Sequence, residues 1–440
     1  MFDMAKAPRI PWWRTPELMS AASRPNRHVL IVSHNFPPIL GPDSVLMRMW
    51  ALAIHRRGWK VTVLTTTSRH WKLKADPGLL EGLPPDMEIL RAPSPEAWLG
   101  RFPSVGSALF RLLAKAGVPD IHGGWRCTAM KRIRPWMQKH RPDLIYSRQP
   151  KHVSAMAAMQ IKQEFGLPWI AHFSDLWAAL PYQDHHTPRQ WRAIKELEAQ
   201  EMAAADALLF VAKRAADMTL ARYDSSVRAK TTLIRHGYET LPGSVHNTRR
   251  QGGGGELHMI HAGAFYPGIS GPQGLFSAIA SLHGERSLKG RFKLTCVGPD
   301  TVVHQPLVDS LGIAGVVDLQ PIVPFAEAQR RVAAADAMLV VPYDSTAMPT
   351  KLFEYFAFEK PILGLAMDDS DTADLMKDCG LPVVPPNEPQ AIAVELRKML
   401  DQWEQGRWGL ADASLQAIAR YHIDHQAEIA GKVMERLVGG

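Results

Sequence analysis

The sequence has few cysteines and no long apolar run. Three cysteines stand among 440 residues, and the spacing of Cys127, Cys296 and Cys379 fits neither a metal site nor a redox motif. Scattered cysteines of this kind are typical of a reducing cytoplasm, where they pack as small apolar residues. No apolar stretch reaches the roughly 18 residues that a membrane-spanning helix needs. Residues 1–27 lack the continuous apolar core of a signal peptide. We therefore expect a cytoplasmic protein.

The charge balance is basic, but the motifs of nucleic-acid binding are absent. Lysine and arginine number 51 against 43 acidic residues, a formal net charge of +8, which favours anionic partners such as nucleotide phosphates or anionic lipid. We find no RNP motif, zinc-finger spacing or basic heptad region, so nucleic acid is not an expected partner. Residues 101–117 mix apolar side chains with Arg111 and Lys115, and further cations follow at 131–141. This segment either makes a peripheral contact with anionic lipid at the inner face of the cytoplasmic membrane or packs on its own domain.

Strand and helix patterns alternate along most of the chain. A buried strand at 28–36 is followed by a helix that ends before Gly58 and by a β-branched strand at 60–66. Strand, helix and strand at this spacing form a βαβ unit, which starts a parallel sheet. Further strands, separated by helices, are expected at 142–147, 168–177, 207–212 and 231–239, and then at 257–263, 292–298, 316–323, 337–343, 360–366 and 381–386.

This alternation predicts an α/β fold of two Rossmann-like, doubly wound parallel-sheet domains that face a central cleft. The expected segments are an N-terminal extension (1–27), a first domain (28–239), a linker (240–256) with four consecutive glycines, a second domain (257–416) and a C-terminal helix (417–440) that packs back on the first domain. Ligands of such sheets bind beyond the carboxyl ends of the strands. The loops that follow strands are therefore where we expect the chemistry.

Seven segments occur in an order that is known from one enzyme family. They are FPP with Gly41, VPDIHGGW (118–125), RPDLIYS (141–147), PWIAHFSDLW (168–177), LIRHGYE (233–239), HAGAFYPG (261–268) and PTKLFEYFAFEKPIL (349–363). The last is the most specific, since it is similar to the pattern P-x-K-x-x-E-Y-x-A-x-x-K/R-P. With these motifs the chain resembles bacterial glycosyltransferase family 4 over most of residues 28–437. The resemblance implies the GT-B fold, in which two Rossmann-like domains face each other, and transfer of a sugar with retention of configuration.

The helix expected at 349–358 carries the strongest donor-site candidates. Glu354 and Lys351 lie three residues apart and share a helix face, next to Thr350 in a first turn that offers free N–H groups to phosphate. The resemblance implies that Glu354 binds the donor ribose and that Lys351 lies near the diphosphate. Without the resemblance, a surface ion pair would be the commoner interpretation of this spacing. Relatives often carry another glutamate eight residues before the last one, where this chain has Thr346.

A glycine-rich loop after the strand at 257–263 is the second donor-site candidate, because glycine lets the backbone approach a ligand closely. The donor-binding residues expected here are Gly263, Ser270 and Gly271, together with Gly41 of the first domain. Many relatives place an Arg and a Lys in this stretch to bind the diphosphate, whereas this chain has Ala264, Phe265 and Ile269 beside Ser270. A lost charge at a leaving group costs about 2–4 kcal/mol of transition-state stabilisation. A cleft-facing arginine of the first domain would offset that loss.

Acceptor-site candidates follow two strands of the first domain. The resemblance implies that Asp175 is a catalytic residue, and His172 is a second candidate to orient the acceptor hydroxyl or relay its proton. Ser174 and Arg148 are candidates to contact the acceptor. Three of these residues have a structural alternative: Asp175 as a turn cap, His172 as a hydrogen-bonded strand-end residue, and Arg148 as a solvated loop residue. The acidic run at 367–371 has D-x-D spacing, but we expect solvated loop carboxylates and no metal there.

The expected function is that of a glycosyltransferase of the hexosyltransferase type. It would move a sugar from a nucleotide-diphosphate donor, with a UDP-sugar as the first expectation, to a hydroxyl of a glycan or lipid-linked glycan in bacterial surface or exopolysaccharide synthesis. No cofactor is expected. The missing Arg and Lys leave one alternative, a non-catalytic protein of the same fold that binds a nucleotide or regulates another glycosyltransferase. A sugar-nucleotide epimerase on a similar fold is a third option, but its motifs are not present.

Overall fold

The computed structural model describes residues 27–67, 75–96, 108–109, 111–113, 115–120, 122–149, 152–178, 187–239, 254–266 and 271–439. Ser270 lies outside the described residues, as do the expected extension up to residue 26, the expected linker up to residue 253, and residues 101–107, 110 and 114 of the basic segment.

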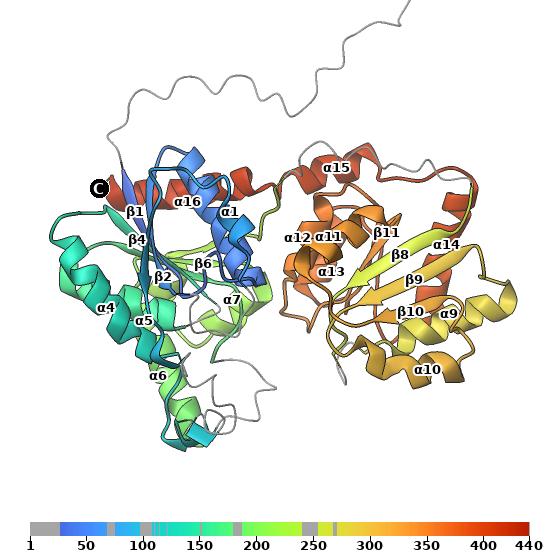
Figure 1. The fold of residues 1–440 in the computed structure, drawn as a ribbon, viewed down its shortest axis with the longest axis horizontal. Helices are drawn as coiled ribbons and strands as arrows, with labels where there is room; N and C mark the ends of the chain where they lie inside the picture. Colours follow the sequence, from blue (N-terminus) through green and yellow to red (C-terminus); the bar gives the residue numbers. More distant parts are fainter. Residues whose placement is uncertain are drawn as a thin grey trace, which may run out of the picture.

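The first domain is built on a parallel sheet of seven strands in the order β3-β2-β1-β4-β5-β6-β7 (Figure 1). The strands are β1 (His28–Val32), β2 (Lys60–Thr66), β3 (Glu88–Ala92), β4 (Leu144–Arg148), β5 (Trp169–Phe173), β6 (Ala207–Phe210) and β7 (Thr231–Leu233). The accompanying helices are α1 (Pro42–Arg56), α4 (Gly124–Met137), α5 (Val153–Phe165), α6 (Pro188–Ala204), α7 (Lys213–Leu220) and α8 (Ser225–Ala229). Helices cover both faces, which is why the central strands are continuous apolar runs.

The second domain repeats this plan with six parallel strands in the order β10-β9-β8-β11-β12-β13. Its strands are β8 (Leu257–Ala262), β9 (Phe292–Val297), β10 (Val317–Gln320), β11 (Ala337–Val340), β12 (Ile362–Leu365) and β13 (Val383–Val384). Its helices are α9 (Gln273–Glu285), α10 (Gln305–Ser310), α11 (Phe325–Ala334), α12 (Thr350–Phe356), α13 (Asp371–Asp378), α14 (Pro389–Glu404) and α15 (Asp412–Ala419). Within the described parts of the chain, no helix has the length and apolar character needed to cross a bilayer.

These two sheets confirm the predicted fold class. In each sheet the strand order reverses beside the first strand, between β1 and β4 and between β8 and β11. Such switch points open a crevice at the carboxyl ends of the strands. The expected strands are present, but β3, α4, α7, α8 and α15 were not anticipated. Helices α7, α8 and α15 are short, and β3 lies at a sheet edge with weak alternation. Helix α4 starts at a pair of glycines and contains Pro135, which are residues typical of loops.

The C-terminal helix α16 (Ile423–Val438) packs on the first domain, beside α1. Its apolar face, which includes Ala427 and Val433, belongs to the same core as Trp50 of α1. The chain reaches α16 by passing Tyr238, whose carbonyl accepts a hydrogen bond from the Ile423 amide at 2.9 Å. The last part of the chain therefore completes the domain that the first part begins.

A buried carboxylate of the second domain is hydrogen-bonded to the first domain. Asp371 begins α13 and is 1 % exposed. It accepts hydrogen bonds from the backbone amides of Lys213 and Arg214, at 2.8 and 2.7 Å, in the first turn of α7. Nη1 of Arg235 lies 3.4 Å from the same carboxylate. This corrects the expectation of a solvated carboxylate at Asp371, which caps a helix of the other domain. Asp368 and Asp369 of the same run are exposed, as expected.

Candidate functional site

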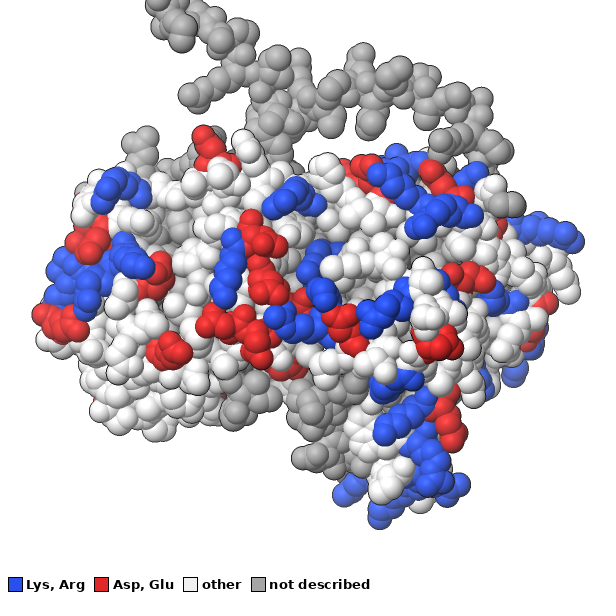
Figure 2. Space-filling view, turned by 180° about the vertical axis from the view of Figure 1, so that it is seen from behind, with Lys and Arg blue, Asp and Glu red and all other residues white. Residues whose placement is uncertain are grey.

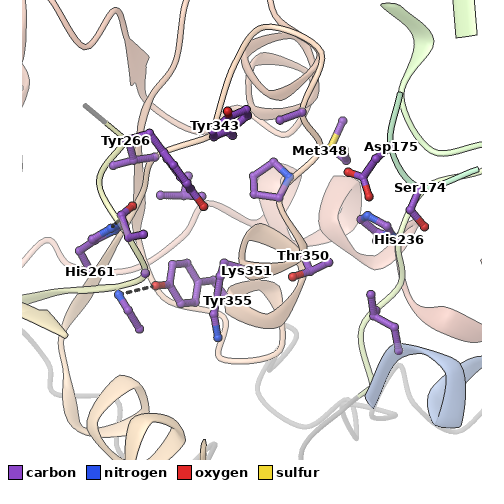
Figure 3. Close-up of a pocket in the computed structure, with 18 of the residues that line it drawn as sticks. Ser174, Asp175, His236, His261, Tyr266, Tyr343, Met348, Thr350, Lys351 and Tyr355 are labelled. Atoms are coloured by element: carbon purple, nitrogen blue, oxygen red, sulfur yellow. Dashed lines mark hydrogen bonds between the residues drawn. The ribbon is translucent and has the colours of Figure 1, made fainter. Parts of the chain in front are cut away.

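A cavity of about 250 Å³ lies between the two domains, at the carboxyl ends of both sheets. The first domain lines it with Asp43, Leu46, Arg148, Ser174, Asp175 and His236. The second domain contributes the loop after β8, the loop after β11 and the start of α12 (Figure 3).

The cavity brings together most of the residues that the sequence singled out. Arg148, Ser174, Asp175 and Gly263 line it, as do Thr350 and Lys351. Glu354 instead lines an adjoining, mostly apolar groove of about 350 Å³ between α1, α11 and α12, which shares Thr350 with the cavity. Gly41 and Gly271 are not among the described residues that line either space. Gly41 directly precedes α1, which starts at Pro42.

Asp175 lies in the loop that follows β5. Figure 3 shows its side chain facing the second domain across the cleft. The surrounding protein and the neighbouring Asp43 carboxylate raise the pKa of Asp175 to about 6, against the lowering effect of Arg148. The side chain is nevertheless exposed to the solvent of the cleft. A carboxylate with a pKa near neutrality is suited to accept or relay the proton of a hydroxyl group.

Arg148 is the cleft-facing arginine of the first domain. It ends β4, is 3 % exposed and lines the same cavity as Gly263. Its Nη2 donates a hydrogen bond to Nδ1 of His236 at 3.1 Å. Burial lowers the pKa of the guanidinium, but an arginine stays charged at neutral pH. The expectation of a solvated loop arginine is therefore wrong, and a buried cation stands where an anionic ligand can reach it.

His172 lies behind the cavity wall. The imidazole is 1 % exposed, its Nδ1 is 2.5 Å from the hydroxyl of Tyr146, and its ring meets the edge of Trp50. Burial and the nearby Arg148 hold the pKa of His172 well below its usual range. Successive side chains of a strand point to opposite faces, and the face that holds His172 packs against α1. This arrangement fits the hydrogen-bonded strand-end histidine and gives His172 no direct access to an acceptor.

Lys351 and Glu354 form an ion pair on α12, with 2.8 Å between Nζ and Oε2. Both side chains are about one-third exposed or less. The amide of Gln329 also donates to the Glu354 carboxylate, at 3.3 Å. Two donors thus hold the carboxylate in the groove that adjoins the cavity, with its remaining lone pairs available to ligand hydroxyls.

The loop after β8 passes very close to the end of β9. A Cβ atom built on Gly298 would lie 2.0 Å from the carbonyl oxygen of Gly263, so only glycine fits there. The Ala262 amide donates to the hydroxyl of Tyr355 at 3.1 Å, which ties this loop to α12 (Figure 3).

The aromatic wall and two polar groups of the cavity were not predicted from the sequence. Tyr266 and Tyr343 meet edge to face at 4.6 Å between ring centroids. Asp43 and His236 both line the cavity beside Arg148. The signals were present but unspecific: Asp43 stands two residues after Gly41, and His236 lies within the LIRHGYE motif.

Comparisons with known proteins agree with this architecture. The sequence profile described as glycosyl transferase 4-like domain matches residues 44–237, and the one described as glycosyl transferases group 1 matches residues 256–402. A search of curated proteins by sequence returned no match.

Among solved structures, a sucrose-phosphate synthase from Thermosynechococcus elongatus superposes with a TM-score of 0.67 at 16 % identity, over 94 % of this chain and 99 % of that one. The Anabaena protein HepE, in complex with UDP and glucose, gives 0.59 at 12 % identity over 93 % and 100 %. WaaG, a glycosyltransferase involved in lipopolysaccharide biosynthesis, gives 0.57 at 16 % identity over 94 % and 100 %. These likenesses concern the fold.

Proposed function

Because the chain belongs to the glycosyltransferase family 4-like proteins and has their GT-B fold, we propose that it moves a sugar from a UDP-sugar to a hydroxyl of a glycan or lipid-linked glycan, with retention. One observation carries the proposal. A single cavity joins Asp175 and Arg148 of the first domain to the Gly263 loop and Lys351 of the second.

The second domain and Arg148 together hold the donor in this proposal. Glu354 binds the ribose hydroxyls, while Lys351 and the backbone of the Gly263 loop face the diphosphate. Arg148 lines the same cavity as Gly263 and supplies a positive charge that this loop lacks. The structural neighbour HepE was solved with UDP and glucose, which supports a uridine nucleotide as the donor class. Buried cations act strongly on a departing diphosphate, because little water screens them.

Asp175 serves the acceptor. In a retaining transfer, the acceptor hydroxyl attacks on the face from which the diphosphate leaves, and a diphosphate oxygen takes up the hydroxyl proton. The ionised Asp175 carboxylate accepts a hydrogen bond from that hydroxyl and so holds its oxygen toward the sugar carbon. Ser174, whose Oγ donates to the carbonyl of Gln149 at 3.1 Å, fixes the loop beside it.

The acceptor class that we propose is a glycan of the bacterial surface, reached at the membrane. Lys and Arg side chains gather on the projecting end of the first domain that carries α6 (Figure 2). There Arg189 of α6 packs against Gly117, two residues after Lys115. Beside them Leu112 is 62 % exposed. An exposed apolar side chain in a basic segment is suited to the surface of an anionic bilayer.

The first experiment measures binding and hydrolysis of a panel of nucleotide sugars by the wild type and by Glu354→Ala, with bacterial membrane extract as the source of acceptor. Release of UDP that depends on one donor and is lost in the variant would support the proposal and name the sugar. Binding without turnover under every acceptor condition would favour a non-catalytic, nucleotide-binding protein. No binding of any nucleotide would contradict the donor site.

A further inference from the structure

The guanidinium of Arg148 is buried in the cavity wall and has few partners. Nη2 donates to His236, whereas Nε has no hydrogen-bond partner among the described residues. Buried donors in folded proteins are nearly always paired. The residue lines the cavity, so its guanidinium has few protein partners that would compete with an anionic ligand for it.

His236 connects this arginine to the other domain. It follows β7 and is 2 % exposed. The ring meets Phe353 of α12 edge-on, with 5.5 Å between ring centroids, and forms a hydrogen bond with the backbone of Met348 in the loop before α12. Figure 3 shows His236 and Met348 at the junction of the two domains.

The chemistry of these contacts fixes the tautomer of His236. A guanidinium only donates hydrogen bonds, so Nδ1 must be the acceptor and Nε2 carries the proton. Nε2 then donates to the carbonyl of Met348. Burial and the charge of Arg148 hold the pKa of His236 well below its usual range, which keeps the ring neutral and the Nδ1 lone pair available.

We propose that His236 is a positioning residue that couples the approach of the second domain to the orientation of Arg148. With Met348 and Phe353 in place, the ring is held and the guanidinium points into the cavity. When the second domain moves away, the ring loses its carbonyl acceptor and its aromatic wall, and the guanidinium is free to turn toward Asp43 or Asp175. The charge that stabilises the leaving diphosphate is thus presented only in the closed cleft. This inference rests on the proposed glycosyl transfer.

Three substitutions of His236 separate its two hydrogen bonds. The Asn side chain places an acceptor near the position of Nδ1 and keeps the contact with Arg148. The Gln side chain places a donor near the position of Nε2 and keeps the contact with Met348. His236→Ala removes both contacts. We expect His236→Ala to lower kcat/KM for the donor by about tenfold or more, mainly through kcat, with the Asn and Gln variants in between.

A double-mutant cycle with Arg148→Met tests whether His236 acts through the arginine. If it does, adding His236→Ala to Arg148→Met lowers kcat/KM by no more than about twofold, because the group that it positions is already gone. Independent, multiplicative losses would overturn the proposal. So would wild-type activity in all three His236 variants.

Two controls keep these outcomes distinguishable. His258→Asn changes a half-buried histidine of β8 that is hydrogen-bonded to Thr295 of β9 at 2.8 Å and does not line the cavity, and it should leave turnover unchanged. Circular dichroism and thermal melting establish that each variant is folded, and UDP binding is measured by calorimetry. If the wild type neither binds UDP nor turns over a donor, the proposed function fails. If the wild type is active and the cycle is multiplicative, only the role of His236 fails.

Discussion

The two domains share the strand order of their six-stranded part, to which the first domain adds β7, but they line the cavity with different chemistry. The first domain lines it with four polar side chains: the buried guanidinium of Arg148, the neutral His236, and the carboxylates of Asp175 after β5 and of Asp43 in the first turn of α1. The second domain offers a close-packed glycine loop, two tyrosines and a lysine that is already paired with Glu354. Charges fixed at buried strand ends act strongly on a reaction, whereas backbone and aromatic surfaces mainly define shape. We infer that the first domain controls reactivity and the second controls recognition of the donor.

The largest effect should come from removing the buried cation. We expect Arg148→Met to lower kcat/KM by about 10²–10³-fold and Lys351→Met by only about tenfold, because Lys351 is partly exposed and its charge is shared with Glu354. UDP release at saturating acceptor measures both. A greater loss in Lys351→Met than in Arg148→Met would reverse the assignment of reactivity to the first domain.

Asp175→Asn should cost about 10²-fold in kcat and at the same time raise the melting temperature. The pKa of Asp175 is raised from 3.8 to about 6, so the folded protein binds this proton more tightly than the unfolded chain does. The contribution of Asp175 to stability is therefore lost as pH rises between these two values, and an amide avoids that loss. The kcat of the wild type should rise with pH through about 6. A flat pH profile, or a variant that melts lower, would contradict this prediction.

Glu354→Gln should raise the KM for the donor by about tenfold and change kcat less, since ribose binding is largely the same in the ground and transition states. The matched control is Glu395→Gln in α14, because Glu395 pairs with Lys398 at the same i,i+3 spacing and 2.9 Å, away from the cavity. If Glu354→Gln reduces kcat alone, the second domain does more than recognise the donor.

The smallest effect on turnover, within about threefold, is expected from Asp371→Asn, which weakens the contact between the domains rather than the cavity. An amide accepts fewer hydrogen bonds than the carboxylate that now meets Lys213, Arg214 and Arg235, and we expect a loss of about 2 kcal/mol in unfolding free energy. Asp374→Asn is the control, because its pair with Arg214 is exposed and worth at most about 1 kcal/mol. Equal losses in urea unfolding of the two variants would argue against the buried contact.

Sequence patterns predicted the fold and part of the cavity. Buried parallel strands are continuous apolar runs, so β1, β2 and β8 were visible, whereas short helices such as α8 carry too few residues for a period. Positions directly after strands located Arg148 and Asp175. For His172 two alternatives stayed open, because its neighbours along the strand do not reveal that it faces Trp50.

The other cavity residues depend on which loops the domains bring opposite each other. Tyr266 and Tyr343 lie 77 positions apart in the chain. Their rings come into contact only because the second sheet brings the loops after β8 and β11 together. The link between His236 and Met348 crosses from one domain to the other, so no local pattern encodes it.

The return of the chain to the first domain has a consequence for the order in which the protein is assembled. During synthesis the whole second domain emerges before α16, while the apolar face of α1 around Trp50 still lacks its cover. Domains generally fold as units as they leave the ribosome. The first domain, although it is synthesised first, should therefore complete its folding last. Until α16 has packed, the apolar face of α1 stays exposed. Nascent chains arrested before α16 should show a protease-resistant second domain and a first domain that is still cleaved.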